Sequence, residues 1–132
     1  MSSVMPSPSS DRDERLYLGD MLQFCERAMT YTEGFSFEAV MADAMRYDAT
    51  LRNLELIGEA ATHVSDPLRS KAPDIEWRRI VGTRNRVAHA YLGIEPETVW
   101  MIVTQHLPML RNQLRALIAS VSDETPGADR VV

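Results

Sequence analysis

Cysteine is almost absent from this sequence, because Cys25 is the only one among 132 residues. One cysteine cannot form an intramolecular disulfide, and it argues against a thiolate metal site. Long apolar runs are absent too: no stretch of roughly 18 apolar residues occurs, so no membrane-spanning helix is predicted. The first ten residues, MSSVMPSPSS, lack the basic and apolar segments of a secretory signal. We therefore expect a cytoplasmic protein with no membrane partner.

Basic residues are fewer than acidic ones, 14 against 19, which gives a net charge of −5. This balance argues against a protein that holds nucleic acid by bulk charge alone. The distribution is uneven, however, because residues 69–86 carry six of the 14 basic residues and two acidic ones. All the basic residues except Lys71 are arginines, which suit bidentate contact with phosphate or carboxylate. This basic stretch is either a ligand-binding surface or a solvated helix face that balances the acidic segment 33–66.

The apolar residues follow helical spacing through most of the chain, and no alternating pattern typical of a strand occurs. The length suits a single domain. Both ends are polar and aperiodic, so we expect disordered tails at 1–10 and 123–132 around a helical domain at 11–122. The predicted fold is all-α, an antiparallel bundle of four to five helices.

The first two predicted helices are long. One covers about residues 12–31, and the next covers about 37–64, with Ser36 as its N-cap. The second helix is apolar on more than one side. We therefore expect it either at the centre of the bundle or against a second copy of the chain.

The other two predicted helices are delimited by turn residues. Asp74 is a candidate cap for the third helix, and Gly93 is expected to end it. The fourth begins at Pro96, where a missing N–H costs nothing, and it contains Pro108, which should kink it.

Most classes of chemical site have no matching residues here. Glycine-rich phosphate loops, paired cysteines and closely spaced histidines are all missing from the sequence. We expect neither a metal ion nor a cofactor. One segment stands apart, GTRNRVAHAYLGIEP at 82–96, because it concentrates chemically active side chains in eight residues: Arg84, Asn85, Arg86, His89 and Tyr91.

An arginine and a histidine suffice for one reaction, the cleavage of RNA by attack of a 2′-hydroxyl on the phosphate. Histidine can take and return a proton near neutral pH, and arginine can stabilise the charge that develops on phosphorus. Asn85 precedes His89 by four residues and could orient the imidazole.

The geometry of a single helix opposes this reaction. Arg84 and His89 would point about 140° apart on a straight helix, so their convergence needs a break near Gly93, the reach of the arginine, or a second subunit. A structural interpretation also fits: His89 caps the helix, Arg84 pairs with an acid of the second helix, and Tyr91 packs in the core.

The segment resembles a known signature, the R-x4-H-x-Y motif of the HepT branch of the HEPN superfamily. Arg84, four intervening residues, His89, Ala90 and Tyr91 fit it without a gap. The likeness covers about residues 14–118, because further segments resemble HepT sequences in order and spacing: RNLELIGEA (52–60), PDIEWRRIVGTRN (73–85), LGIEPETVW (92–100) and HLP (106–108).

This resemblance implies a HEPN-like bundle that forms a homodimer, in which the motifs of two subunits line a shared cleft. It implies the toxin of a HEPN/MNT toxin–antitoxin pair, a metal-independent ribonuclease acting on tRNA or mRNA. Arg84 and His89 would be the catalytic pair, with Asn85 as a supporting residue. Tyr91 matches the tyrosine to which the partner, an MNT nucleotidyltransferase antitoxin, transfers AMP. Each AMP would bring negative charge and bulk to the cleft.

Two questions remain open on the sequence. Arg78, Arg79 and Arg86 are candidates for RNA phosphate contacts, or they serve solubility only. The whole chain could instead be a non-catalytic HEPN module beside a nucleotidyltransferase, in which Arg84 and His89 position ATP or the partner. A plain helical adaptor, in which none of the motif residues matters, is the third interpretation.

Overall fold

The computed structural model describes residues 10–89 and 93–123. These two ranges contain helices and connecting turns and no β-strand, which confirms the predicted all-α fold. The elements are α1 (Ser10–Thr32), α2 (Phe37–Ala42), α3 (Ala44–Ala61), α4 (Asp66–Arg69), α5 (Trp77–Ala88), α6 (Pro96–Met101), a π-helical turn (Ile102–His106) and α7 (Leu107–Asp123).

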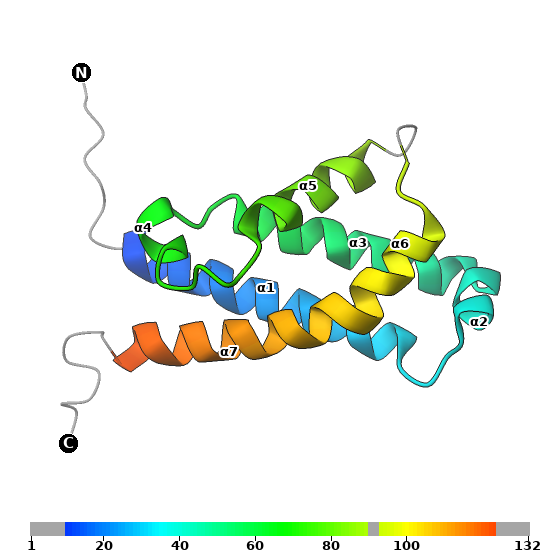
Figure 1. Ribbon diagram of the computed structural model, residues 1–132, viewed down its shortest axis with the longest axis horizontal. Helices are drawn as coiled ribbons and strands as arrows, with labels where there is room; N and C mark the ends of the chain where they lie inside the picture. The colour runs from blue at the N-terminus through cyan, green and yellow to red at the C-terminus, as the bar shows by residue number, and fades with distance from the viewer. Residues whose placement is uncertain (1–9, 90–92, 124–132) are drawn as a thin grey trace.

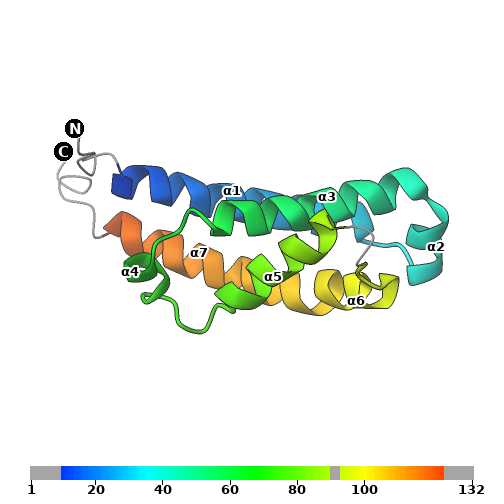
Figure 2. The same cartoon turned by 90° about the horizontal axis from the view of Figure 1, so that it is seen from above.

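The long helices α1, α3 and α7 run side by side along the long axis of the molecule, and α1 is antiparallel to the other two (Figures 1 and 2). Their facing side chains form the core, among them Leu18, Met21, Cys25, Leu54, Ile57, Leu110, Leu114 and Leu117. α5 lies outside this group and packs mainly on α3. The predicted antiparallel bundle is therefore confirmed, with α5 at its edge.

The only cysteine of the sequence belongs to this core. Cys25 is fully buried, and its thiol donates a hydrogen bond to the carbonyl oxygen of Leu107 at 3.3 Å. Burial raises the pKa of the Cys25 thiol to about 12, because the interior disfavours the charged thiolate. Cys25 is thus a packing residue that ties α1 to the start of α7.

The predicted helix at 37–64 is wrong in one respect, because it is divided at Asp43. This residue has extended backbone angles (φ −109°, ψ 94°), and its side chain accepts a hydrogen bond from the backbone N–H of Arg46 at 3.1 Å. A short acidic side chain can replace the helical bond in this way, so it ends α2 and caps α3. The N-cap at Ser36 is confirmed, since its hydroxyl accepts from the N–H of Ala39.

The start and end of α5 also differ from the prediction. Asp74 does not cap this helix, which begins at Trp77. The carboxylate of Asp74 instead accepts a hydrogen bond from Gln113 of α7 at 3.2 Å. At the other end α5 stops after Ala88, and Gly93, with a φ of +74°, lies beyond the helix rather than at its last turn.

The fourth predicted helix is continuous but bent. Pro96 occupies its first turn, as expected. Pro108 has no N–H to donate to the carbonyl four residues earlier, and the chain widens into the π-helical turn Ile102–His106 immediately before it. Figure 1 shows the resulting bend between α6 and α7.

The predicted tails lie outside the described residues, except that Ser10 begins α1 and Asp123 ends α7. Within the described ranges, no helix combines the length and the apolar character that crossing a membrane requires.

Candidate functional site

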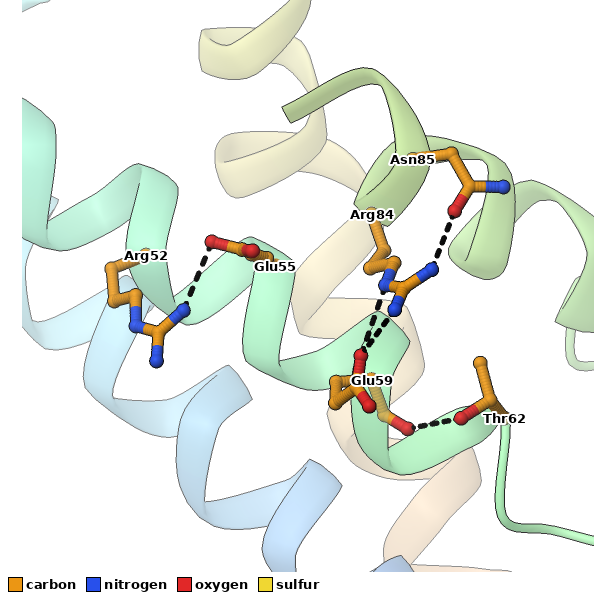
Figure 3. A network of polar contacts seen from close by, with 6 residues as sticks. All are labelled: Arg52, Glu55, Glu59, Thr62, Arg84 and Asn85. Atoms are coloured by element: carbon orange, nitrogen blue, oxygen red, sulfur yellow. Dashed lines mark hydrogen bonds and ion pairs between the residues drawn. The ribbon is translucent and has the colours of Figure 1, made fainter. Parts of the chain in front are cut away.

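Arg84 occupies a packing position of α5. The helix turns its apolar residues toward the bundle, and Trp77 and Ile80 precede Arg84 on that side at helical spacing. A residue at this place would ordinarily be apolar, as Leu54 is on the facing helix α3. The side chain of Arg84 points at α3 (Figure 3), so its position is set by the contact between two helices.

The backbone of α3 comes close to Arg84 because the facing residue is Gly58. A Cβ atom placed on Gly58 would lie 2.2 Å from the Cβ of Arg84 and 2.9 Å from the carbonyl oxygen of Ile80. Both distances are shorter than non-bonded atoms tolerate. Glycine therefore lets α5 approach until the first carbons of the Arg84 side chain rest against α3.

Glu59, the next residue of α3, receives the guanidinium group. Arg84 Nε and Nη2 donate to the same oxygen, Glu59 Oε1, at 3.0 and 2.6 Å. Arg84 Nη1 donates to Oδ1 of Asn85 at 2.8 Å. Figure 3 shows the guanidinium held between the two partners. The Arg84 and Glu59 side chains are 34% and 48% exposed, so water weakens their attraction.

The guanidinium of Arg84 has more N–H groups than the contacts with Glu59 and Asn85 use. A guanidinium has five N–H donors, and Glu59 and Asn85 take three of them. Among the described residues, one N–H on each terminal nitrogen has no acceptor, at a side chain that is one-third exposed. A phosphate oxygen is the kind of acceptor that such a pair of donors suits.

His89 lies where α5 ends. It is the C-cap residue, with φ −104° and ψ 72°, and its backbone N–H donates to the carbonyl oxygen of Asn85 at 3.1 Å. Its own carbonyl oxygen accepts from the N–H of Gly93 at 3.3 Å. The residue is exposed. The chain therefore leaves the helical path at the histidine of the motif.

Among the residues that the structure describes, no hydrogen bond joins Arg84 to His89. The hydrogen bonds of Arg84 in the described part of the chain go to Glu59 and Asn85. The amide oxygen of Asn85 is on Arg84, so an orienting contact from Asn85 to the imidazole stays a prediction. Tyr91 lies outside the described residues.

The other candidate arginines are on the outer surface of α5. Arg78, Arg79 and Arg86 are exposed, and Arg79 pairs with Glu76 at 3.0 Å. Arg79 and Arg86 are seven residues apart and therefore share a helix face. Contact of these arginines with RNA stays a prediction.

In the structural interpretation of the sequence, Arg84 pairs with an acid of the second predicted helix and His89 caps α5, and both contacts are present. It missed the roles of Gly58 and Glu59. One feature of the sequence could have indicated Glu59. Arg84 is a charged residue inside the apolar face of α5, and such a charge requires a partner on the helix that this face contacts.

An apolar groove of about 300 Å³ lies between α3, α5 and the start of α7, lined by residues including Ile57, Ile80, Leu107 and Met109. Neither Arg84 nor His89 lines this groove. In the described part of the chain, no three His, Cys, Asp or Glu side chains gather as a metal site would require.

Comparison with known proteins identifies relatives over most of the chain. The family described as Ribonuclease HepT-like matches residues 21–117. A candidate RNase of Caldanaerobacter subterraneus is 32% identical over 104 residues, 79% of this chain and 93% of that protein. A candidate RNase of Methanocaldococcus jannaschii is 30% identical, with 80% and 96% covered, and the probable ribonuclease HepT of Thermococcus cleftensis is 29% identical, also with 80% and 96% covered. No solved structure matches the chain.

Proposed function

The chain belongs to the ribonuclease HepT-like family, and from this premise we propose that it is a metal-independent ribonuclease whose catalytic residues are Arg84 and His89. The observation that carries the proposal is the setting of Arg84. A cation occupies a packing position of α5, is oriented by two neighbours and, within residues 10–89 and 93–123, keeps two N–H donors available. This is the arrangement that a phosphate-binding arginine needs.

The proposed reaction is attack of a ribose 2′-hydroxyl on the adjacent phosphorus. His89 takes the proton of the 2′-hydroxyl or gives a proton to the departing 5′-oxygen, and water carries out the other of these two proton transfers. Arg84 neutralises charge on the phosphorane. The products are a 2′,3′-cyclic phosphate and a free 5′-hydroxyl. The backbone turn at His89 and its exposure support this role, since the imidazole must reach substrate from the end of α5.

A homodimer completes the proposed site. Because Arg84 is held against α3 while His89 lies at the helix end, we propose that the two motifs of a dimer line one cleft and that RNA lies between them. Pairing also doubles the local positive charge, with Arg78, Arg79 and Arg86 as phosphate contacts. This concentration of charge offsets the net charge of −5 that each chain carries.

Control of this activity is proposed to lie at Tyr91. In this proposal the protein is the toxin of a toxin–antitoxin pair in the cytoplasm, and an MNT-type nucleotidyltransferase antitoxin transfers AMP to Tyr91. The tyrosine follows His89 by two residues in sequence. An AMP group there would place a phosphodiester charge and a bulky nucleoside beside the RNA site and would block it.

A non-catalytic binding module is the second candidate function. The ion pair between Arg84 and Glu59 favours it, since a paired arginine can serve packing alone. In that case the arginine and histidine would support binding of a nucleotidyltransferase or its ATP, and RNA would remain intact.

Expression in a bacterial host distinguishes the two functions. Wild type, Arg84→Ala and His89→Ala are compared for growth and for the integrity of total RNA, with Arg52→Ala as the matched control from another half-exposed Arg–Glu pair. We expect growth arrest with RNA cleavage for wild type and Arg52→Ala only. Arrest with intact RNA, or cleavage by both motif variants, would contradict the proposal.

Antitoxin control is tested in the same host. Co-expression of the nucleotidyltransferase should restore growth to cells that express the wild type and should leave cells that express Tyr91→Phe arrested. Equal rescue of both would contradict AMP transfer to Tyr91.

A further inference from the structure

We infer that Glu59 is a positioning residue for the reaction: it holds the guanidinium of Arg84 in the orientation in which the remaining N–H groups face the RNA phosphate. This inference rests on the proposed ribonuclease function and adds to it a residue outside the R-x4-H-x-Y motif. It depends on the contact between α3 and α5 rather than on α5 alone.

The first support is the way the Arg84 side chain is confined at its base. Gly58 leaves no Cβ between the helices, so the Cβ and Cγ of Arg84 lie directly over the backbone of α3. A long side chain normally has many rotamers, and this close contact removes most of them. The guanidinium therefore lies beside Glu59, the residue that follows Gly58.

The second support is the pattern of the bonds to Glu59. One carboxylate oxygen accepts from both Nε and Nη2, which fixes one edge of the planar guanidinium. Asn85 holds Nη1 from the side of α5. Two contacts from two different helices define the plane of the group, whereas one contact would leave it free to rotate about its stem. The plane then determines where the two available N–H groups point.

The third support is a comparison with a neighbouring pair on the same helix. Arg52 and Glu55 form an ion pair one turn earlier in α3, with one hydrogen bond at 3.1 Å between residues three apart. That pair lies within one helix and orders nothing outside it. Glu59 reaches across to α5 through two bonds, and the two residues are 25 positions apart in sequence. Only the second pair can set the position of a residue in the motif.

The test compares kcat and KM for cleavage of an RNA oligonucleotide by the full-length protein. Glu59→Ala should lower kcat by about 10- to 100-fold, because the arginine is displaced from the position that the reaction needs. KM should not rise, because removing a negative charge does not weaken the attraction between the protein and RNA. Glu59→Gln should recover part of kcat, because its amide oxygen can still accept both N–H bonds. Glu55→Gln is the matched control and should leave both constants unchanged.

Two further measurements exclude a merely structural effect. The melting temperature of Glu59→Ala should stay within about 5 °C of wild type, as expected for a half-exposed ion pair. The double variant Glu59→Ala/Arg84→Ala should be no less active than Arg84→Ala alone. If the double variant were less active than Arg84→Ala by the factor that Glu59→Ala alone loses, Glu59 would act independently of the arginine, and the inference would be overturned.

Two outcomes separate this inference from the proposed function. If Glu59→Ala cleaves RNA faster than wild type, Glu59 obstructs Arg84 rather than positioning it, and the inference fails while the ribonuclease proposal stands.

If the wild-type protein does not cleave RNA, the proposed function fails, and the NMR signal of the Arg84 Nε–H group decides the inference. That proton should exchange slowly with water in wild type and rapidly in Glu59→Ala, with Arg84→Lys identifying the signal. Equal exchange in both proteins would overturn the inference.

Discussion

The core between α1, α3 and α7 and the contact between α3 and α5 are built on different principles. In the core, apolar side chains such as Leu18, Leu54 and Leu114 face one another and exclude water. Between α3 and α5, a glycine lies opposite an arginine, and a half-exposed carboxylate completes the contact. The first arrangement provides stability through buried apolar area. The second contributes little stability and fixes the position of a charged group.

Under the proposed function, the difference separates folding from activity within one small domain. α3 takes part in both regions, with Leu54 and Ile57 directed to the core and Glu59 directed to the solvent side of its contact with α5. A substitution of a core residue of α3 should therefore change mainly the free energy of unfolding, and a substitution of Glu59 mainly the activity. A substitution of Gly58, which lies where α3 meets α5, should change both. The following predictions test this separation, from the largest effect on stability to the smallest.

Leu54→Asp should have the largest effect. Leu54 is 3% exposed and lies in the centre of the core, so an aspartate there would be a buried charge with no partner. We expect a loss of about 4 kcal/mol or more, enough to unfold a domain of ordinary stability. Leu51→Asp, at a half-buried position of the same helix, should cost less. Circular dichroism during heating measures both. A cooperative transition of Leu54→Asp at the wild-type temperature would contradict the account of the core.

Gly58→Ala should have an intermediate effect. Its methyl group would collide with the Cβ of Arg84 and the carbonyl oxygen of Ile80, so α5 must move away from α3. We expect a loss of about 1 to 3 kcal/mol in the free energy of unfolding, together with loss of RNA cleavage, because Arg84 is displaced. Urea denaturation and a cleavage assay measure the two effects.

Gly82→Ala is the matched control on α5. A methyl group there would have no neighbour within 4 Å, and alanine is the better helix former. It should leave cleavage unchanged and stabilise the helix by up to about 1 kcal/mol. If the two glycine variants behaved alike, the close approach at Gly58 would have no role in the site.

Arg84→Ala should have the smallest effect on stability. The ion pair with Glu59 is exposed to water, and alanine suits a helix, so the free energy of unfolding should change by about 1 kcal/mol or less. A large loss of stability in thermal or urea denaturation would mean that Arg84 is a structural residue and would favour the non-catalytic interpretation.

Much of the fold could be predicted from the sequence because apolar spacing directly reflects which side of a helix is buried. The regular apolar stripes of α1 and α7 predicted the helical bundle. Pro96 marked the start of a helix, which the structure confirms. The break at Asp43 could not be predicted in this way, since the apolar stripe continues across it and a local side-chain bond decides the outcome.

The candidate site was predictable only in part. The sequence identified Arg84 as a candidate for the site and, in the structural interpretation, offered an acidic partner on the second predicted helix. It could not identify Glu59 among several acids of that helix, because the choice depends on where α3 and α5 cross. That crossing is set by Gly58, whose importance appears only when the distance between the two backbones is known.

The roles of Arg84 and His89 are tested by measuring RNA cleavage and stability together in purified wild type, Arg84→Ala and His89→Ala, in the presence of EDTA. We expect wild type to cleave RNA with the chelator present and both variants to lose cleavage by at least about 100-fold. The free energies of unfolding of all three proteins should agree within about 1 kcal/mol. Cleavage by Arg84→Ala at the wild-type rate, or loss of cleavage that follows loss of folded structure, would contradict these roles.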